Sequence, residues 1–360
     1  MTRSNRSPHG GPRPSGTARI AVDLLGGDGA PAVVVDGALQ ACSADPDLEL
    51  HLVGPQKVAD EVIGALAAPD RRRVTVSVVD AAVGMAESPL RGIRRDTTVR
   101  AAAELTYAKR TDAMVSAGSS GAAVAAASHV LGRFPGVRRP SLAATLPSTT
   151  GPVVLLDVGV GLDATMLELV QHAILGTSYA SVALGIARPR VGLLSIGSEP
   201  GKGDRLRRAV AVALTDLPLP AGGRYVGLVE GHDVPIGGPA DVVVTDGFTG
   251  NVLLKGMEGA FALARKAKAG QDEPSQDHPS QDLPENAMPE SAAVLLGVSG
   301  TVVVCHGAAT GGDVASGIAF AARLHREAVV STVATLAEEL LSELSSAGGL
   351  TIRDALGERS

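Results

Sequence analysis

The stretch DVVVTDGFTGNVLLKGMEG (residues 241–259) carries the pattern that decides the fold. It begins with a run of β-branched residues, passes through a turn that holds glycines, and continues into apolar residues spaced three and four apart. A buried strand that turns through glycine directly into a helix is typical of a parallel sheet covered by helices. The stretch therefore predicts an α/β protein, with a strand at Asp241–Thr245 and a helix at Val252–Lys268.

The same alternation extends in both directions along the chain. Further strands are predicted at Arg19–Asp23, Glu49–Val53, Val74–Val79, Asp112–Ala117, Leu142–Leu146, Val153–Asp157, Arg190–Ile196, Arg224–Val229 and Thr301–Cys305. Helices are predicted in many of the gaps, among them Thr98–Lys109, Ala122–Leu131, Thr165–Leu184, Asp204–Leu214 and Asp313–Leu344. The pattern predicts a large, mostly parallel sheet, either in one domain or split between two lobes.

The composition excludes several classes of protein. The 360 residues carry a formal charge of −6 and only 2% aromatic residues, whereas proteins that bind nucleic acid need excess Lys and Arg and aromatic stacking platforms. The longest apolar stretch, 165–187, is interrupted by polar residues, so no segment is expected to span a membrane. The two cysteines have no metal-ligand spacing, and the N-terminus has no apolar signal segment. These features predict a reduced, cytoplasmic enzyme without structural zinc. The chain also has no HExxH or EF-hand spacing, so no metal site is expected.

Three segments fall outside the alternating pattern. Residues 1–18 are predicted to be a flexible leader and residues 346–360 a C-terminal tail, on either side of one α/β domain at 19–345. Within that domain, residues 269–291 contain GQDEPSQDHPSQDLPENAMPE, which is rich in Pro, Asp and Gln and has neither a helical nor a strand period. This segment predicts a solvated surface loop that does no chemistry.

Six of the predicted strands lead into loops that combine glycine with polar residues. They are DLLGGDGAP (23–31), SAGSSGA (116–122), DVGVGLD (157–163), IGSEPGKGD (196–204), TDGFTGN (245–251) and CHGAATGGD (305–313). One such loop is usually only a tight turn, but glycine also lets backbone N–H groups approach an anion closely. Six together predict convergence at one edge of the sheet around a phosphate or another small anion. The chain lacks the GxxxxGK[ST] and GxGxxG fingerprints of nucleoside triphosphate and dinucleotide sites.

A few side chains in these loops are candidates for chemistry. Lys202 follows a strand and precedes a helix, so its ammonium is placed to reach a phosphate; the alternative is an exposed surface lysine. Asn251 and Asp246 flank a glycine turn at a helix start, where the alternative for each is a capping residue. His306 lies at the carboxyl end of a strand beside glycine, and its alternative is a buried core histidine.

Taken in order, eight blocks of the sequence resemble the phosphate acyltransferase (PlsX) family of bacterial phospholipid synthesis. The blocks are IAVDLLGGDGAP (20–31), VSAGSSGA (115–122), LGRFPGVRRPSLA (131–143), LLDVGVGLDA (155–164), VGLLSIGSEPGKG (191–203), VEGHD (229–233), DVVVTDGFTGNVLLKGMEG (241–259) and LLGV…CHG (295–307). The resemblance runs from about residue 19 to 259 and resumes from about 295 to 326.

The resemblance implies a three-layer α/β/α sandwich of the isocitrate/isopropylmalate dehydrogenase-like kind, without the cofactor of those enzymes, and a homodimer. It implies a reaction in which inorganic phosphate attacks the thioester of acyl-acyl carrier protein, giving acyl phosphate and free carrier protein. The lysine of the KG loop and the asparagine of GFTGN hold phosphate in this family, and they correspond to Lys202 and Asn251 as the catalytic residues.

Around these two residues we expect the glycine-rich loops to bind phosphate and substrate. The expected binding residues are Gly26, Gly27, Asp28, Gly118, Ser119, Ser120, Gly121, Asp157, Gly159, Asp246, Gly247, Thr249, Gly250 and His306. Carrier proteins are acidic, so the cluster of Arg133, Arg138 and Arg139 is a candidate docking surface, with a solvated charged face as the alternative. Apolar residues near Leu253 and Leu254 predict either an acyl channel or ordinary core packing.

Several positions depart from the family pattern. Ser119-Ser120 replaces Asn-Thr, Ala308-Ala309 replaces a serine pair, and asparagine is replaced at Gly161, Ser195 and Leu228. The lost amides and hydroxyls motivate a second hypothesis, a non-catalytic paralogue that binds acyl carrier protein or lipid-synthesis enzymes. Residues 269–291 stand where the family has an amphipathic helical hairpin, and this argues against peripheral membrane association. The acyl donor is left open between carrier protein and coenzyme A.

Overall fold

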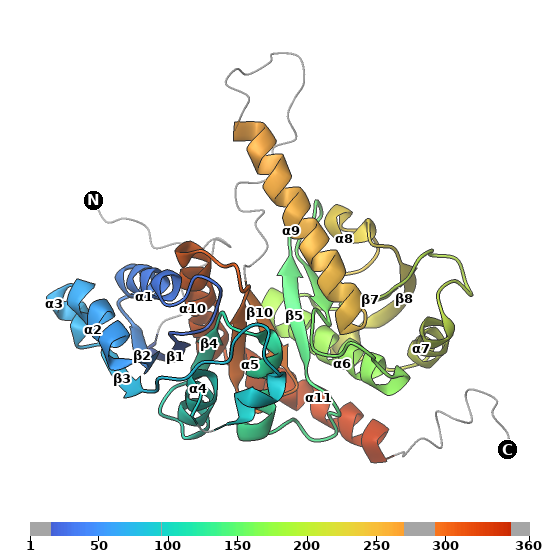
Figure 1. Ribbon diagram of the computed structural model, residues 1–360. Helices are drawn as coiled ribbons and strands as arrows, with labels where there is room; N and C mark the ends of the chain where they lie inside the picture. The colour runs from blue at the N-terminus through green and yellow to red at the C-terminus, as the bar shows by residue number, and fades with distance from the viewer. Residues whose placement is uncertain (1–15, 95, 270–291, 347–360) are drawn as a thin grey trace.

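The computed structural model describes residues 16–94, 96–269 and 292–346. Within these ranges, eleven strands form a single sheet in the order β3-β2-β1-β4-β11-β10-β5-β6-β9-β7-β8 (Figure 1). The strands are β1 (Ala18–Asp23), β2 (Leu48–Gly54), β3 (Val74–Val78), β4 (Ala113–Ser116), β5 (Ser141–Leu146), β6 (Val153–Leu156), β7 (Arg190–Leu194), β8 (Arg224–Val229), β9 (Val242–Val244), β10 (Ala292–Leu296) and β11 (Thr301–Cys305).

The direction of the strands divides the sheet into two blocks. The neighbouring strands β3, β2, β1, β4 and β11 are parallel to one another, as are β6, β9, β7 and β8. Between the blocks, β10 is antiparallel to both β11 and β5, and β5 is antiparallel to β6. Three reversals in succession leave the two blocks running in opposite directions, so their loops leave opposite edges of the sheet. Strand direction alone therefore does not bring all six loops to one edge of the sheet, because a sequence pattern locates strands without fixing their directions.

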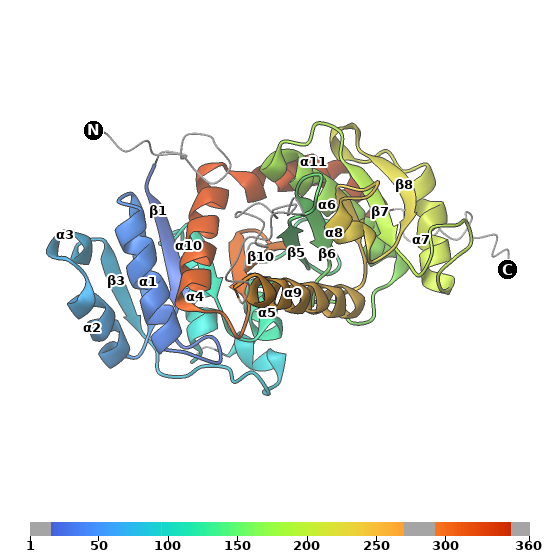
Figure 2. The same ribbon diagram turned by 90° about the horizontal axis from the view of Figure 1, so that it is seen from above.

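Helices cover both faces of the sheet, which makes three layers (Figures 1 and 2). One face packs against α1 (Ala32–Ala44), α2 (Gln56–Ala65), α6 (Met166–Leu184), α7 (Arg205–Thr215), α10 (Gly311–Arg326) and α11 (Val329–Ser346). The other face packs against α4 (Thr98–Tyr107), α5 (Ser120–Val130), α8 (Asp233–Ile236) and α9 (Gly247–Ala269). Short helical turns occur at α3 (Ala68–Arg71), η1 (Pro89–Ile93) and η2 (Pro220–Gly222). Neighbouring residues of β1 show the alternation: Ile20 and Val22 point into one core and Ala21 into the other.

The ten predicted strands are all present, with ends that agree to within two residues. The strand β10 was not predicted, because a five-residue apolar run has no period that separates a strand from a helix. The helix predicted at Asp313–Leu344 is two helices, α10 and α11, which meet at Ala328 with a φ of 51°. No sequence signal marks this break, because neither glycine nor proline stands there.

The segments at the edges of the predicted domain are only partly described. Ala18, assigned to the leader, is the first residue of β1, and Ala269, assigned to the loop, is the last residue of α9. The rest of the predicted loop, 270–291, and the tail beyond Ser346 lie outside the described residues. Over the part of the chain that the structure describes, no helix combines the length and the apolarity needed to cross a bilayer.

Candidate functional site

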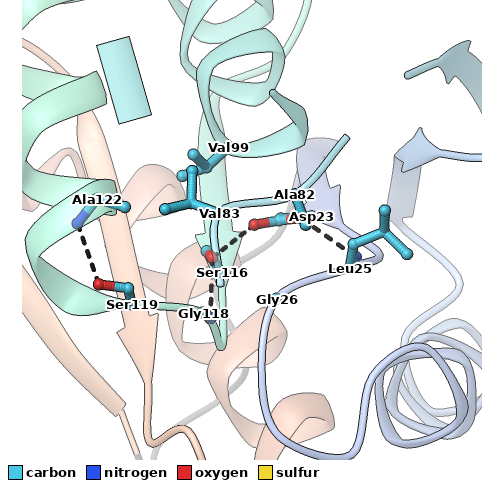
Figure 3. Close-up of a pocket in the computed structure, with 10 residues that line it drawn as sticks. All are labelled: Asp23, Leu25, Gly26, Ala82, Val83, Val99, Ser116, Gly118, Ser119 and Ala122. Atoms are coloured by element: carbon cyan, nitrogen blue, oxygen red, sulfur yellow. Dashed lines mark hydrogen bonds between the residues drawn. The ribbon is translucent and has the colours of Figure 1, made fainter. Parts of the chain in front are cut away.

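The loops of β1 and β4 meet through a buried carboxylate (Figure 3). Ser116 donates its hydroxyl hydrogen to Asp23 Oδ2 at 2.8 Å and accepts the N–H of Gly118 at 3.1 Å. Gly26 leaves no room for a side chain here, since a Cβ would lie 2.7 Å from the Gly118 nitrogen. Burial raises the pKa of Asp23 by more than the hydrogen bonds from Thr98, Ser116 and Leu25 lower it. Asp23 therefore holds the two loops together.

The loop of β11 joins the same cluster. The Asp28 N–H donates to the Gly307 carbonyl at 2.9 Å, and a Cβ on Gly27 would lie 3.1 Å from the Ala117 carbonyl oxygen. The cavity between the β1 and β4 loops holds about 10 Å³, which is room for about one water molecule and not for phosphate. Its lining residues are Asp23, Leu25, Gly26, Ala82, Val83, Val99, Ser116, Gly118, Ser119 and Ala122. One edge of the sheet thus holds five of the predicted residues: Gly26, Gly27, Asp28, Gly118 and His306.

The predicted residues 119–121 begin helix α5. Ser119 is the N-cap of this helix and accepts the N–H of Ala122 at 3.4 Å, while Ser120 is the first helical residue. Gly121 packs closely against Pro89, whose Cγ would lie 2.9 Å from a Cβ on the glycine. In the structure as it stands, the Ser119 hydroxyl caps the helix.

The loop of β6 is organised by Asp157, which is fully buried. Its carboxylate accepts backbone N–H groups from Leu142, Gly159, Val160 and Gly161 at 2.6 to 3.2 Å. These bonds fold the loop around the carboxylate and occupy its oxygens, so Asp157 positions the loop in place of holding an anion directly. The sequence signal for this role is the DxGxG spacing, because an aspartate followed by glycines commonly accepts hydrogen bonds from the N–H groups of its own turn.

The start of α9 packs tightly onto this loop. A Cβ on Gly250 would lie 2.0 Å from the Asp157 carbonyl oxygen, and one on Gly247 would lie 2.8 Å from Asp157 Oδ2. A Cβ on Gly159 would lie 4.0 Å from the side-chain Cγ of Asn251, so that side chain faces the β6 loop. The β6 and β9 loops therefore form a second cluster, with Asn251 between them.

Asp246 joins this cluster to α7. It accepts the N–H and the hydroxyl of Thr249 at 2.8 and 2.9 Å and also binds the guanidinium of Arg207, which was not predicted. Burial alone would raise the pKa of Asp246, but the Thr249 and Arg207 hydrogen bonds outweigh it and the pKa is lowered. Arg207 also donates to Asp204, the N-cap of α7, at 2.9 Å. The sequence signal for Arg207 is its place three residues after that N-cap.

Lys202 lies on the loop between β7 and α7 and is exposed. It lines a cavity of about 440 Å³ between α7 and β8, together with Arg208, Val212, Tyr225 and Leu228. Burial raises the pKa of Tyr225 to about 12. Because β7 and β9 are parallel neighbours, Lys202 and Asn251 leave the same edge of the sheet. The described contacts link their loops through Arg207 and Asp246.

Helix α9 connects this second cluster to the first. It begins at the end of β9, and one turn beyond Asn251 its residue Lys255 contacts Nε2 of His306, at the end of β11. Glu258 of the same helix approaches His306 Nε2 to 3.5 Å. The His306 ring is partly exposed at a loop, so it is not a core histidine. Lys255 and Glu258 were not singled out from the sequence, although both lie in the stretch that decided the fold.

The three arginines predicted for docking differ in their surroundings. Arg133 and Arg138 are exposed, and the Arg133 guanidinium donates to the Arg138 carbonyl. Arg139 is half-buried, pairs with Glu168 at 3.4 Å and would lie 3.3 Å from a Cβ on Gly161. Arg139 therefore packs against the β6 loop.

Two other expectations concern the apolar side chains and the departures from the family pattern. Leu253 and Leu254 pack against the core on the α9 face, as the core alternative predicted. Leu228, at a position of lost asparagine, lines the 440 Å³ cavity and is 9% exposed. Its apolar side chain makes that cavity less polar than an asparagine would.

Comparison with known proteins adds to this geometry. A family model described as "Fatty acid synthesis protein" matches residues 18–276. The phosphate acyltransferase of Thermobifida fusca is 41% identical over 332 residues, covering 89% of this chain and 90% of that protein. The phosphate acyltransferase of Syntrophomonas wolfei is 35% identical over 315 residues, covering 87% and 96%.

Solved structures with a similar fold are more distant in sequence. The EutD phosphotransacetylase from Staphylococcus aureus aligns with a TM-score of 0.56 and 14% identity, covering 87% of this chain and 96% of that one. A phosphotransacetylase from Streptococcus pyogenes aligns with a TM-score of 0.55 and 15% identity, covering 88% and 94%. At this level of identity the two structures support the fold, while the family rests on the sequence matches. By those matches, the chain belongs to the phosphate acyltransferase (PlsX) family.

Proposed function

We propose that this protein is an acyltransferase of phospholipid synthesis that moves a fatty acyl group from acyl-acyl carrier protein to inorganic phosphate. The observation that carries the proposal is the second loop cluster, where Lys202 and Asn251 leave the carboxyl ends of two adjacent parallel strands. The 35–42% identity to proteins named phosphate acyltransferase supports the same reaction. The name of the matched family, fatty acid synthesis protein, agrees with a lipid substrate.

The chemistry requires positioning more than proton removal. Phosphate at neutral pH is substantially dianionic, since the second pKa of a phosphomonoester lies near about 6. A phosphate oxygen attacks the thioester carbonyl, the carbonyl oxygen takes the negative charge, and the carbon–sulfur bond then breaks. The thiolate that leaves takes up a proton from solvent. The products are acyl phosphate and the free thiol, and no histidine base is needed.

In this mechanism Lys202 and the glycine-rich loops hold the phosphate. Asn251, which faces the β6 loop at Gly159, is the polar group assigned to the reacting carbonyl. Asp157, Asp246 and Arg207 position these groups through the hydrogen bonds they make. Removing one donor to a developing oxyanion typically costs about 2.7–4 kcal/mol.

The cavity between α7 and β8 suits the acyl chain. Its volume of about 440 Å³ lies within the range of roughly 300–1,000 Å³ common for ligand pockets. Val212, Tyr225 and Leu228 contribute apolar surface to its lining, and Lys202, Arg208 and Thr215 contribute polar groups. An acyl chain in this cavity would have its carboxyl end near the phosphate-binding lysine.

Several finer features belong to the same proposal. The protein would be a cytoplasmic homodimer whose sandwich is of the isocitrate/isopropylmalate dehydrogenase-like kind. The exposed Arg133 and Arg138 would contribute to docking of the acidic carrier protein, with Arg139 ordering the loop behind them. The domain would extend over residues 19–345.

The test is release of free carrier-protein thiol from acyl-acyl carrier protein, measured with the full chain in the presence and absence of phosphate. We expect release only with phosphate, and loss of most of it in Lys202→Ala. Lys57→Ala, an exposed lysine on α2, is the matched control and should retain activity. A parallel reaction with an acyl-coenzyme A thioester identifies the donor.

Absence of release at high enzyme concentration, or full activity in Lys202→Ala, contradicts the proposal. A chain that binds carrier protein without turnover, and whose thermal stability phosphate does not raise, is instead a non-catalytic paralogue. A ligand that binds only the folded state must raise that stability.

A further inference from the structure

Two hydrogen-bond donors face each other where α9 meets the end of β11. Lys255 Nζ contacts His306 Nε2, and the Glu258 carboxylate approaches the same nitrogen to 3.5 Å. Lys255 is exposed, and the side chains of His306 and Glu258 are each 35% exposed. A small solute can therefore reach this group from solvent.

A backbone hydrogen bond fixes which ring nitrogen of His306 carries the proton. The Ala308 N–H donates to His306 Nδ1 at 3.0 Å. A backbone N–H can only donate, so Nδ1 is the acceptor and the neutral ring carries its proton on Nε2. The Nε2–H and the Lys255 ammonium therefore meet as two donors with no lone pair between them.

Opposed donors of this kind suit an anion, which supplies the missing lone pairs and accepts from both sides. We propose that Lys255 Nζ and His306 Nε2–H bind an oxygen of a phosphate-type oxyanion between them. The Glu258 carboxylate, 3.5 Å from Nε2, partly neutralises the donors when no ligand is bound. This inference rests on the proposed function, to which it adds a second anion site.

The surroundings hold the histidine in place. Its neighbour Gly307 accepts the Asp28 N–H at 2.9 Å, and a Cβ on Gly307 would lie 2.7 Å from Met85 Cε. The β11 loop is thereby fixed by the first loop cluster. The lysine is fixed by α9, in which it lies four positions after Asn251, a rise of about 6 Å. The second anion would therefore lie beside the reaction site.

Two sources supply a phosphate-type oxyanion in the proposed reaction. One is inorganic phosphate, the nucleophile. The other is the phosphoester group on the pantetheine arm of the acyl donor, which carrier protein and coenzyme A share. Both present oxygens that accept from an ammonium and an imidazole N–H, so the experiment separates them.

The experiment compares Lys255→Met and His306→Asn with the control Lys57→Ala. His306→Asn keeps an oxygen that can accept the Ala308 N–H and removes the Nε2–H donor. The increase in thermal stability produced by inorganic phosphate and by coenzyme A is measured in each variant, and again with Lys202→Ala added to remove the first anion site. The KM for phosphate and the KM for the acyl donor are measured in parallel.

We expect Lys255→Met and His306→Asn each to weaken binding of one oxyanion at least tenfold, and Glu258→Gln to strengthen it. A raised KM for phosphate assigns the site to the nucleophile, and a raised KM for the donor assigns it to the phosphoester. The proposal is overturned if both variants bind phosphate and coenzyme A as Lys57→Ala does and only their unfolding temperature falls. That result would make the group a structural bridge between α9 and β11.

The binding arm needs no turnover, so the two proposals fail separately. Wild-type protein without thiol release, but with Lys255-dependent binding of an oxyanion, would retain this site and lose the proposed reaction. Active protein in which Lys255 and His306 affect neither ligand would retain the reaction and lose this site.

Discussion

Arg207 on α7 binds the carboxylate of Asp246, the last residue before α9. The guanidinium side chain is 13% exposed and the carboxylate 9%, so solvent screens the pair little. Through this pair, the loop that carries Lys202 is tied to the helix that carries Asn251. The relative position of the two predicted catalytic residues therefore depends on Arg207, whose described side-chain hydrogen bonds go to Asp204, Asp246 and Thr249.

Removing the guanidinium should loosen that connection. Arg207→Ala is expected to lower the free energy of unfolding by about 1.5–3 kcal/mol, the usual worth of hydrogen bonds to a charged group. Urea unfolding measures the change, with Arg224→Ala, an exposed arginine on β8, as the control. A double-mutant cycle with Asp246→Ala should give a coupling energy well above zero. Simple additivity would show that the pair does not join the two loops.

Asn251→Ala should reduce kcat for phosphate-dependent thiol release by about 100- to 1,000-fold, the typical effect of losing one oxyanion donor. The KM for phosphate should change little, because the interaction forms mainly in the transition state. The matched variant is Val252→Ala, whose side chain on the same turn is 59% exposed. Equal activity of the two variants would remove Asn251 from the reaction.

Alanine substitutions at two glycines of α9 distinguish the effect of close packing from the effect of helix propensity. In Gly250→Ala the new Cβ would meet the Asp157 carbonyl oxygen at 2.0 Å, so the helix or the β6 loop must move. We expect a loss of about 1–3 kcal/mol or more in the free energy of unfolding. Gly256→Ala meets nothing within 4 Å and should stabilise the protein by about 0.5–1 kcal/mol. Circular dichroism during denaturation measures both, and a neutral Gly250→Ala would contradict the close contact.

Filling the cavity between α7 and β8 should shorten the acyl chains that the enzyme accepts. Val212→Trp places a large ring at the cavity wall, and activity with long-chain donors should fall at least tenfold while short-chain donors are spared. Val78→Trp, on the strand at the opposite end of the sheet, is the control, because that valine is 55% exposed. A uniform loss with all chain lengths would mean that the acyl group binds elsewhere.

The buried His172 on α6 predicts a pH dependence of stability. Burial lowers its pKa below the ordinary 6.5, by more than the nearby carboxylates of Asp157 and Glu168 raise it. The unfolded chain therefore binds a proton more readily than the folded one, and stability falls as the pH drops below about 6.5. Urea unfolding from pH 7.5 to 5 measures the slope, which His172→Gln should reduce. Part of the slope should remain, because burial also lowers the pKa of His51.

Much of the fold could be predicted because each strand is a short apolar run bounded by turns. The stretch 241–259 alone gave a strand, a glycine turn and a helix, and β9 and α9 follow it closely. The directions of the strands could not be predicted in this way. They depend on two hairpins, β5-β6 and β10-β11, and one strand of the second hairpin carries no periodic signal.

The sequence predicted which residues belong to the candidate site better than it predicted how those residues contact one another. Glycine-rich loops that approach one another closely were predictable, and Gly26 and Gly250 have no room for a Cβ. The roles of Asp157 and Arg207 were not predictable, because they depend on which backbone N–H groups and carboxylates come within reach after folding. Whether Lys202 at the phosphate and Asn251 at the carbonyl act in one reaction stays a prediction for the thiol-release experiment.

The regular rise of helix α9 fixes the distance between the contact that Asn251 makes and the contact that Lys255 makes. Asn251 faces the β6 loop and Lys255 contacts His306, and the two residues lie four positions apart on this one helix. Inserting one residue between them would swing the lysine by roughly 100° around the helix axis. The ammonium would then point away from the histidine while every loop kept its own sequence.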